Sequence, residues 1–526
     1  MASDAYKRIL VRGVNWIGDA VMTMPAIRAL RREFPSAHVT LLVKPSVAPL
    51  FEKDPLLDEV LIYGPEFRGV RGRLRLASLL RRKRFDVAVL LQNAFDAALV
   101  SFLAGIPRRI GYDRDGRGFL LTTPVPFQRD DRSMHHVRYY LELLRGAGIE
   151  GGDTSPWLYL TIEERVHARD AFFHLRRPIL GVNPGATFGS AKRWLPERFA
   201  EVGWRFIREM GGSVVVFGGK AETGIAQEVE RIILDRLDGS LPRVVTIEPL
   251  PRELFMNLAG HTSLRGLSAL IAECDLILTN DSGPMHVAYA VGTPLVALFG
   301  STDPALTGPL GESDEVIKPS LSCSPCFERS CPEQTLRCMR DISAGEVYAA
   351  VRRLTPQRPA VFFDRDGTLC RDAHYLRGWD EFETFPEIGH LRSLRDKGFA
   401  LIGLTNQSGI ARGIVDRGFV EEVNSIFVKR HGFDDFLYCP HSPDEHCPCR
   451  KPESGMVASA RRRHRLDLKS SFVVGDKDAD MLLARAVGAK GILVRTGHQQ
   501  GSQYAYAVAA DLRDAVRIIL EEQGTS

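Results

Sequence analysis

The chain has no apolar run of about 18 residues, the length that a membrane-spanning helix needs. No apolar leader precedes the first strand-like run at residues 9–11, so the sequence predicts a cytoplasmic protein. An excess of charge of one sign is also lacking, because the net charge is only +4 over 526 residues. That balance excludes the bulk positive field typical of nucleic-acid binding, and no nucleic-acid partner is expected.

Cysteine is scarce and unevenly placed. The chain has nine cysteines, and most of them fall into two short clusters. In a reducing compartment such clusters favour metal binding over disulfides. One cluster has the spacing Cys-x2-Cys-x4-Cys-x6-Cys, which favours free thiols in a packed loop, with a structural zinc site as the alternative. Its members are Cys323, Cys326, Cys331 and Cys338.

Basic residues concentrate in one stretch near the N-terminus. Arg68, Arg71, Arg73 and Arg75 are followed closely by the basic run at residues 81–84. Two interpretations stay open: a solvated helix face, or a contact for an anionic acceptor or a membrane surface.

Short apolar runs alternate with amphipathic helical patterns, among them a helix expected over about 19–34. This alternation predicts doubly wound α/β sheets. It extends over roughly 340 residues, more than one such sheet needs, so two Rossmann-like domains are predicted at 1–175 and 176–354. Two prolines mark a linker at 355–359, and a third α/β domain follows at 360–526. The strand-like runs are residues 9–11, 39–43, 87–91, 179–182, 214–217, 276–278, 360–363, 401–404 and 472–474.

The third domain opens with an apolar run that ends in two acids, Asp364 and Asp366. Reactive groups gather at the carboxyl ends of parallel strands. Asp364 is placed to attack phosphorus, and Asp366 to protonate the leaving oxygen. Two carboxylates so close repel unless a cation lies near them, which predicts Mg²⁺.

Later strand ends supply the other parts of a phosphoryl-transfer site. Thr405 and Asn406 follow one apolar run, and Asp476 follows another. Between them, Arg450 and Lys451 offer positive charge for a phosphate.

Residues 360–500 resemble the haloacid dehalogenase (HAD) superfamily. More closely, they are similar to the D-glycero-D-manno-heptose 1,7-bisphosphate 7-phosphatases and the related histidinol phosphatases. The resemblance implies that Asp364 is the nucleophile and Asp366 the general acid/base. It implies Mg²⁺ ligation by Asp364, the carbonyl of Asp366, and Asp476. It also implies that Thr405 and Lys451 bind the transferred phosphoryl group, whereas Asn406 and Arg450 face the substrate.

A short loop between the phosphatase motifs carries two ligand pairs, Cys439-x-His441 and Cys447-x-Cys449. Thiolate and imidazole at this spacing favour tetrahedral zinc, with His446 as a rival ligand and unliganded thiols as the alternative. The resemblance implies a structural role for this zinc. A second Asp-x-Asp-Gly string occurs at residues 113–116, but no long apolar run precedes it, so a loop is predicted there.

The first two domains carry a different set of motifs. Asp19 follows a glycine turn at the start of a predicted helix, where it serves either as an N-cap or as a catalytic group. Small residues, a lysine, acids and a histidine follow three strand-like runs of the second domain, a composition that suits the phosphates and ribose of a nucleotide. These residues are Thr187, Lys192, Glu222, Asp281, Ser282, Gly283 and His286.

Residues 7–350 resemble the inverting heptosyltransferases of lipopolysaccharide synthesis, which have two facing Rossmann-like domains in the GT-B arrangement. The motif around Lys192 is more similar to the second inner-core transferase than to the first. The resemblance implies that Asp19 deprotonates the acceptor hydroxyl and that the seven residues of the second domain bind the ADP part of ADP-heptose. Lys192, helix N-termini and His286 would stabilise the leaving diphosphate, so no metal is required for transfer.

The sequence thus predicts a bifunctional enzyme of lipopolysaccharide core synthesis. Its substrates would be ADP-heptose, a heptose bisphosphate and a lipid-linked core acceptor, and it would work in the cytoplasm, with contact at the inner membrane left open. One alternative is a histidinol-type phosphatase fused to another nucleotide-sugar transferase. A second is an N-terminal half that binds a nucleotide sugar without turnover.

Overall fold

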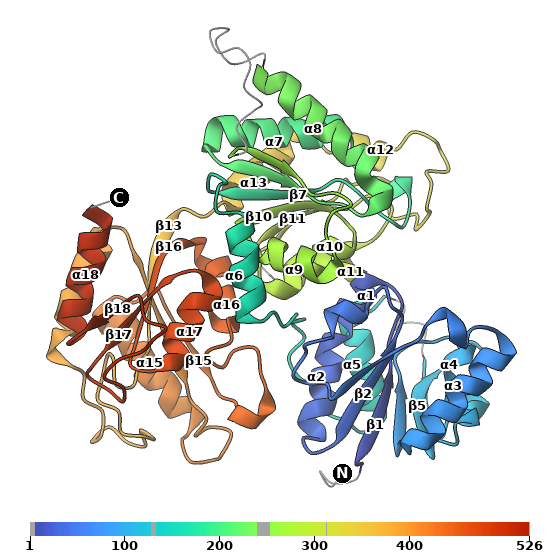
Figure 1. Cartoon of the computed structure of the whole chain (residues 1–526), viewed down its shortest axis with the longest axis horizontal. Helices are drawn as coiled ribbons and strands as arrows, with labels where there is room; N and C mark the ends of the chain where they lie inside the picture. The colour runs from blue at the N-terminus through green and yellow to red at the C-terminus, as the bar shows by residue number, and fades with distance from the viewer. Residues whose placement is uncertain (1–5, 128–132, 239–252, 312, 525–526) are drawn as a thin grey trace. The chain divides into compact units, whose positions relative to one another are not determined.

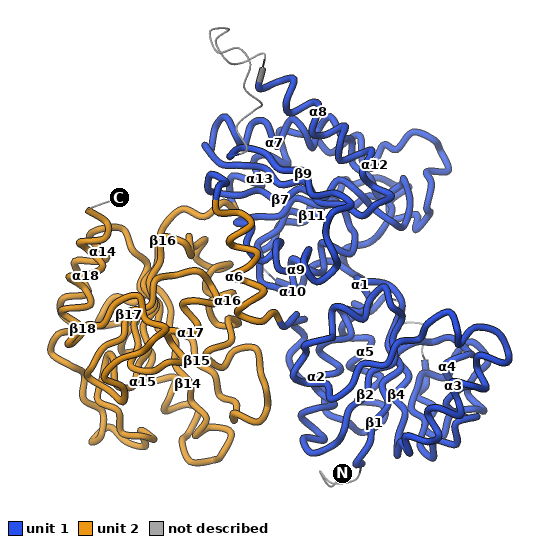
Figure 2. Tube along the Cα trace, in the orientation of Figure 1, with its two compact units in different colours: residues 1–159, 174–353 blue, residues 160–173, 354–526 orange. Residues whose placement is uncertain are grey.

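The computed structural model describes residues 6–127, 133–238, 253–311 and 313–524. Its contacts divide the chain into two compact units, residues 1–159 with 174–353, and residues 160–173 with 354–526 (Figure 2). None of the helices in the described ranges has the length and apolar character to cross a membrane.

Three six-stranded parallel sheets form the framework, two in the first unit and one in the second (Figure 1). The first has the order β3-β2-β1-β4-β5-β6. Its strands are β1 Arg8–Arg12, β2 His38–Val43, β3 Glu59–Ile62, β4 Val87–Leu90, β5 Arg108–Asp113 and β6 Thr123–Pro126. The second has the order β12-β11-β10-β7-β8-β9. Its strands are β7 Ile179–Asn183, β8 Ser213–Val216, β9 Phe255–Asn257, β10 Leu276–Asn280, β11 Leu295–Leu298 and β12 Glu315–Ile317.

The third sheet has the order β15-β14-β13-β16-β17-β18. Its strands are β13 Arg358–Phe363, β14 Ala400–Asn406, β15 Asp435–Cys439, β16 Leu466–Gly475, β17 Lys490–Val494 and β18 Ala507–Ala509. In each sheet the chain starts at an inner strand, winds to one edge, and returns to the other side. The order reverses between β1 and β4, between β7 and β10, and between β13 and β16, and ligands of such sheets bind outside the carboxyl ends at these points. The predicted doubly wound fold class is confirmed.

Helices follow most of the strands. Those of the first unit are α1 Ile17–Met22, α2 Met24–Glu33, α3 Gly69–Lys83, α4 Phe95–Leu103, α5 His136–Gly146, α7 Pro196–Met210, α8 Thr223–Asp238, α9 Leu264–Glu273, α10 Gly283–Val291, α11 Pro304–Thr307, α12 Arg337–Arg340 and α13 Ala344–Leu354. Those of the second unit are α6 Ile162–Ala171, α14 Leu391–Asp396, α15 Arg417–His431, α16 Gly455–His464, α17 Asp478–Val487 and α18 Leu512–Gly524.

The helix expected over about 19–34 is divided into α1 and α2. The division falls at Thr23, whose hydroxyl donates to the carbonyl of Ala20 at 2.7 Å. Pro25 lies in the first turn of α2, the position where a proline ring is tolerated because its missing N–H is not needed. The division leaves α1 as a short separate helix that carries Asp19.

Residues 160–173 pack against the third sheet's unit, a feature that the expected division at residue 175 did not include (Figure 2). Helix α6 starts with a capping box between Thr161 and Glu164. At its other end, Arg169 donates to the last carbonyls of α17, those of Arg485 at 3.0 Å and Ala486 at 3.2 Å. A cation at a helix C-terminus satisfies exposed carbonyls and complements the helix dipole. The three-domain division itself stays a prediction.

The Asp-x-Asp-Gly string at residues 113–116 forms the predicted turn. Asp115 and Gly116 have left-handed backbones, with φ of 57° and 69°. A strand does precede the turn, because β5 runs to Asp113. This strand was not expected, since its first residues are two arginines.

Candidate active sites

A cavity of about 730 Å³ lies in the first unit, where the first and second sheets present their carboxyl ends. Asp19 of α1 lines it from the N-terminal sheet. The second sheet contributes six of the seven residues predicted to bind the donor: Thr187, Lys192, Asp281, Ser282, Gly283 and His286. The structure therefore brings the predicted base and most of the predicted donor ligands into one site.

Glu222, the seventh predicted donor ligand, does not line this cavity. Its carboxylate accepts a hydrogen bond from the Gly219 N–H at 2.8 Å and lies directly against Gly185, where a Cβ would come within 2.2 Å of it. Glu222 thus closes the turn after β8, and the missing side chain of Gly185 makes room for it.

Lys192 is held by an acid at the end of β10. Its ammonium lies 2.5 Å from Asp281, and the Thr302 hydroxyl donates to the same carboxylate oxygen at 2.5 Å. Asn280 ties the two loops together, because it donates to the Pro184 carbonyl and accepts from the Trp194 N–H. A nearly buried cation is thereby fixed at the cavity wall, where it can meet a diphosphate.

His286 lies on α10 against the start of α1. A Cβ on Gly18 would come within 2.6 Å of the His286 ring, so only glycine allows this approach. Burial lowers the pKa of His286 to about 4, although Asp281 and Asp19 act in the opposite direction. His286 is therefore neutral at neutral pH and can offer a hydrogen bond to a ligand but no charge.

Asp19 has a histidine partner that the sequence did not indicate. His136, near the start of α5, places its Nδ1 3.6 Å from Asp19 Oδ1, and it lines the same cavity. Other unexpected lining residues are Phe188, Arg329 and Thr302. The Lys192 ammonium lies 4.6 Å and the Arg329 guanidinium 5.4 Å from the centre of the Phe188 ring. Thr302 comes from a loop without a motif, Arg329 from the loop of the first cysteine cluster and His136 from α5, whereas Phe188 lies in the motif around Lys192 without having been predicted as a ligand.

The site of the second unit lies at the carboxyl ends of β13, β14 and β16. Lys451 is buried and lies 2.6 Å from Asp364 and 2.7 Å from Asp480, and it also donates to the Leu404 carbonyl. Burial raises the pKa of Asp364 to about 6, while Lys451 acts to lower it. Burial alone would lower the pKa of Lys451, but the two acids outweigh it and the net shift is upward.

Asp366 is held in place by donors from four residues, one of them the Cys370 thiol at 3.8 Å. The buried Arg365 binds both of its oxygens, at 3.0 and 3.1 Å, and Gln407 donates to it at 2.7 Å. Thr405 donates to the same carboxylate at 3.3 Å. Arg365 and Gln407 were not among the predicted site residues, although both lie within the predicted motifs.

The structure fits a divalent cation near Asp364. Carboxylate oxygens of Asp364, Asp476 and Asp480 lie within 4.8 Å of one another, and all three residues are buried. Asp476 Oδ1 has no hydrogen-bond partner among the described residues. Two lysines face these three carboxylates, Lys451 at Asp364 and Asp480 and Lys477 at 3.7 Å from Asp476. The remaining negative charge is one that a hard, oxygen-seeking cation would offset. Asp480 was missed, although it closes the acid-rich string that begins at Asp476.

The remaining predicted phosphatase residues lie beside this cluster. The Asn406 side chain and the Lys451 backbone exchange two hydrogen bonds, at 3.0 and 3.2 Å. Arg450 donates to the carbonyl of His441 at 3.5 Å. Lys451 thus contacts the acids, and the preceding Arg450 contacts the cysteine loop.

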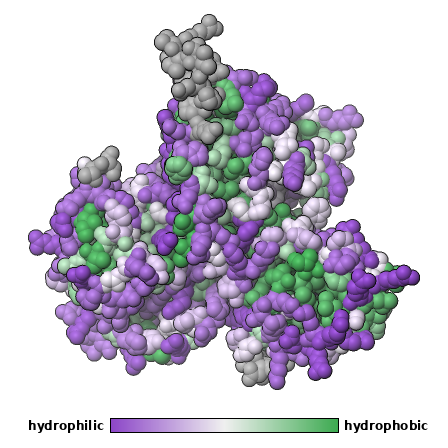
Figure 3. Space-filling view, viewed as in Figure 1, coloured by the Kyte–Doolittle hydropathy of each residue, from purple (hydrophilic) through white to green (hydrophobic). Residues whose placement is uncertain are grey.

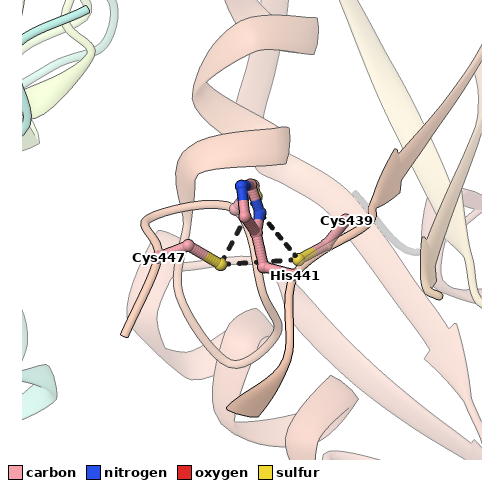
Figure 4. Close-up of side chains that lie close together, drawn as sticks. Cys439, His441 and Cys447 are labelled. Carbon is pink, nitrogen blue, oxygen red and sulfur yellow. Dashed lines mark hydrogen bonds between the residues drawn. The ribbon is translucent and has the colours of Figure 1, made fainter. Parts of the chain in front are cut away.

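The cysteine loop brings the four predicted zinc ligands together. Ligand atoms of Cys439, His441, Cys447 and Cys449 all lie within 4.8 Å of one another. Figure 4 shows three of them pointing at a common centre, with Cys439 Sγ 3.6 Å from His441 Nδ1 and 3.4 Å from Cys447 Sγ. His446, the rival ligand, is not part of the group.

The other cysteine cluster does not form such a group. Among the described residues, the sets of three or more metal-binding side chains with ligand atoms within 4.8 Å do not include Cys323, Cys326, Cys331 and Cys338. Cys338 is buried and packs at Gly300, whereas the Cys331 sulfur accepts from the Leu336 N–H at 3.4 Å. The grouping of side chains thus gives no support to the possible second zinc site, and the favoured interpretation, free thiols in a packed loop, fits the structure.

Two family models match separate parts of the chain. The model of glycosyltransferase family 9 (heptosyltransferase) matches residues 73–337, which is about half of the chain. A HAD-hydrolase-like model matches residues 448–515.

Individual relatives agree with this division. Lipopolysaccharide heptosyltransferase 2 of Escherichia coli (strain K12) is 33% identical over 363 residues, covering 67% of this chain and 100% of the relative. The D-glycero-beta-D-manno-heptose-1,7-bisphosphate 7-phosphatase of Photorhabdus laumondii is 37% identical over 184 residues, covering 32% of this chain and 97% of the relative. The solved structure of E. coli ADP-heptose LPS heptosyltransferase II has 31% identity and a TM-score of 0.55, and the match covers 66% of this chain and 98% of that one.

Proposed function

The chain belongs to glycosyltransferase family 9, the heptosyltransferases, and also to the HAD-like heptose bisphosphate phosphatases, and on this premise we propose the reaction of each part. The enzyme is bifunctional and acts in lipopolysaccharide core synthesis. Its first part transfers heptose from ADP-heptose to the lipid-linked inner core, and its second part removes the 7-phosphate of heptose 1,7-bisphosphate. One observation carries the proposal: in each part an acid follows a strand at the point where the strand order of the sheet reverses, and a lysine lies near it. Asp19 shares a cavity with Lys192, and Asp364 forms an ion pair with Lys451.

For the transfer, Asp19 takes the proton of the acceptor hydroxyl while the hydroxyl oxygen attacks the anomeric carbon of heptose. The bond from that carbon to ADP breaks, and ADP leaves with the electron pair. Lys192 and the N-terminus of α10 stabilise the negative charge that develops on the diphosphate. The cavity that Asp19 shares with Lys192 and Asp281 supports this assignment. Because His286 is neutral, its part is a hydrogen bond and not a charge.

For the hydrolysis, Asp364 attacks the phosphorus of the 7-phosphate and forms an aspartyl phosphate. Asp366 protonates the leaving sugar oxygen and then takes a proton from the water that cleaves the intermediate. Lys451 and Thr405 orient the phosphoryl oxygens, and Asn406 and Arg450 face the sugar. The contacts of Lys451 with Asp364 and of Thr405 with Asp366 support these roles.

We assign two metals to the phosphatase part. Mg²⁺, which HAD phosphatases use, would be held by Asp364, Asp476 and the carbonyl of Asp366, and would offset the charge of the phosphate. Zn²⁺ would be held by Cys439, His441, Cys447 and Cys449 and would fix the loop that leads into Arg450 and Lys451. The clustering of the four ligand atoms supports the zinc assignment.

The lipid-linked acceptor lies at a membrane surface, and helix α3 is suited to approach one. Residues Gly69–Lys83 contain six basic residues and no acid. Val70 and Leu74 are 71% and 53% exposed and lie one turn apart. Figure 3 shows apolar residues among hydrophilic ones on the face of this domain. We propose that α3 contacts the anionic lipids of the cytoplasmic face of the inner membrane.

The choice of substrate distinguishes the proposed function from its alternatives. Family membership does not favour a histidinol-type phosphatase, another nucleotide sugar, or a binding protein without turnover. The test is to offer the full chain heptose 1,7-bisphosphate or histidinol phosphate with Mg²⁺, and separately ADP-heptose with an inner-core acceptor. Phosphate release from the heptose compound and consumption of ADP-heptose are expected. Preference for histidinol phosphate, or a bound donor that is never consumed, would contradict the proposal.

A further inference from the structure

The donor cavity contains one cation to which the proposed transfer chemistry gives no role. Arg329 lines this cavity from the loop between Cys326 and Cys331, and its side chain is exposed. Its guanidinium forms no ion pair with any of the described residues and lies instead over the Phe188 ring. Arg329 therefore presents an unused positive charge to a ligand of the cavity.

The other charges of the cavity lining are largely paired. The acids, lysines and arginines among the lining residues are Asp19, Asp281, Asp303, Lys192 and Arg329. Lys192 is neutralised by Asp281, from which it lies 2.5 Å, and Asp303 pairs with Lys318 at 3.2 Å. Burial lowers the pKa of His286 to about 4, so this ring adds no charge at neutral pH. A diphosphate would thus meet no net positive charge in these paired groups unless Arg329 takes part.

Backbone contacts anchor the loop that carries Arg329 at two places. The Arg329 carbonyl accepts from the Ala191 N–H at 3.1 Å, and it lies so close to Gly189 that a Cβ there would collide with it. Earlier in the loop, the Phe327 N–H donates to the Ser301 carbonyl at 2.7 Å. The first contact fixes the loop beside the turn that holds Lys192, and the second fixes it just beyond the end of β11. The backbone thus places the Arg329 side chain at the cavity, where it can meet a ligand.

Arg329 and Lys192 lie near the same aromatic ring. The guanidinium is 5.4 Å and the ammonium 4.6 Å from the centre of the Phe188 ring. Two cations so close repel each other, and an anion bound between them relieves this repulsion. A guanidinium binds phosphate oxygens through paired N–H donors, whereas a lysine acts as a point charge. The two cations therefore suit two linked phosphates better than a neutral base or a neutral sugar.

We propose that Arg329 binds the diphosphate of the nucleotide-sugar donor and forms, with Lys192, a two-cation clamp on it. The inference rests on the proposed transferase function and adds a residue that none of the nucleotide motifs indicated. In the transfer, the bond from the anomeric carbon to the diphosphate oxygen breaks, and the electron pair stays on that oxygen. Arg329 offsets the charge that develops there, which Lys192 cannot do alone while Asp281 holds it.

The experiment compares Arg329→Gln with Arg337→Gln, a matched change at an exposed arginine of α12 that lies 3.8 Å from Asp341 and outside the cavity lining. Calorimetry on the full chain, without added Mg²⁺, measures the affinities for ADP, AMP and adenosine. Arg329→Gln is expected to weaken ADP binding at least about 10-fold, to weaken AMP binding less, and to leave adenosine binding unchanged. Arg337→Gln should leave all three affinities unchanged.

An equal loss of affinity for all three ligands, or an unchanged affinity for ADP, would overturn the inference. Arg329→Lys provides a second measurement, because it keeps the charge and should bind ADP more tightly than Arg329→Gln does. Equal weakening of ADP binding by the two changes would show that the charge is not what matters, and would also overturn the inference. If the wild-type protein binds no ADP, the proposed transferase function itself fails, and that outcome is distinct from a difference between variants.

Discussion

At the scale of single residues, Asp364 is a buried carboxylate that lies among other charged groups of the phosphatase part. It is buried, lies 2.6 Å from Lys451, and shares its surroundings with Asp476 and Asp480. Asp364→Asn keeps the shape but removes the proposed nucleophile, so phosphate release should fall to background while heptosyl transfer is unchanged. Colorimetric phosphate detection beside a transfer assay checks this. Release near the wild-type rate would exclude Asp364 as the nucleophile.

Asp19 is the corresponding residue of the transferase part. Asp19→Asn cannot accept a proton, so transfer should fall by at least about 10²-fold. ADP-heptose affinity, measured by calorimetry, should change little, because Lys192 and Asp281 remain. The phosphatase serves as the internal control and should be untouched. If affinity and turnover fell together, Asp19 would be a donor ligand or a helix cap.

His286 predicts a pH dependence of stability. Its pKa in the folded protein is about 4, below the ordinary value of 6.5, because the ring is buried. Between these values the unfolded chain binds a proton that the folded chain does not, so the free energy of unfolding decreases as the pH falls. Between pH 7.5 and pH 5, the protonation of His286 in the unfolded chain should lower the free energy of unfolding by about 2 kcal/mol.

Calorimetric unfolding of wild type and His286→Gln at the two pH values tests this contribution. The variant lacks the titrating ring. On acidification, the free energy of unfolding of its transferase part should therefore decrease by about 2 kcal/mol less than that of the wild type. Equal losses would show that His286 is protonated in the folded protein.

Motif residues at strand ends could be predicted from the sequence, because chemistry and strand position are local signals. Asp364 and Asp366 follow β13 and Asp281 follows β10, as the pattern indicated, and their catalytic and binding roles stay predictions. His136 and Arg329 could not be predicted. They reach the donor cavity from loops or helices whose position depends on tertiary packing.

At the scale of elements, the cysteine loop places four grouped side chains that could hold a metal directly before Arg450 and Lys451. We predict one zinc per chain, lost in Cys447→Ser and kept in the matched Cys326→Ser, because only the first cysteine belongs to a set of grouped ligands. Phosphatase activity should fall with the metal, since the loop leads directly into Arg450 and Lys451. Metal content by mass spectrometry checks the prediction, and a zinc-free, fully active protein would contradict it.

Helix α3 gives the membrane proposal a direct test. Each basic residue near an anionic surface contributes about 1 kcal/mol, so Arg75→Glu should weaken binding to vesicles with anionic lipid at least about 5-fold. Arg231→Glu on α8 makes the same charge change at an exposed site and should have no effect. Sedimentation with anionic and zwitterionic vesicles provides the measurement. Equal binding of both variants would assign α3 to a merely solvated face.

Element boundaries were harder to predict than elements. A single helix was expected over about 19–34, and the chain forms α1 and α2 because of Thr23 and Pro25. Strand β5 was not expected at all, since it begins with two arginines and its apolar run is short. The first case depends on a local hydrogen bond and a proline, whereas β5 depends on pairing with β4 and β6.

At the scale of the whole molecule, three sheets repeat one strand order, and each presents its chemistry at the same topological point. This repetition was predictable, because strand–helix alternation and right-handed crossovers leave few arrangements. The packing of α6 beside α17 was not, because it is decided by contacts such as Arg169 with the end of α17. A fusion of two catalytic parts follows from the sites and from family membership alike.

The most direct test of the bifunctional account uses one preparation of the full chain and both substrates. With Mg²⁺ and heptose 1,7-bisphosphate, it should release one phosphate per sugar and leave the 1-phosphate intact. With ADP-heptose and an inner-core acceptor, it should release ADP and add one heptose. Asp364→Asn should abolish only the first reaction and Asp19→Asn only the second. A protein that performs only one of the reactions, or variants that lose both together, would contradict the account.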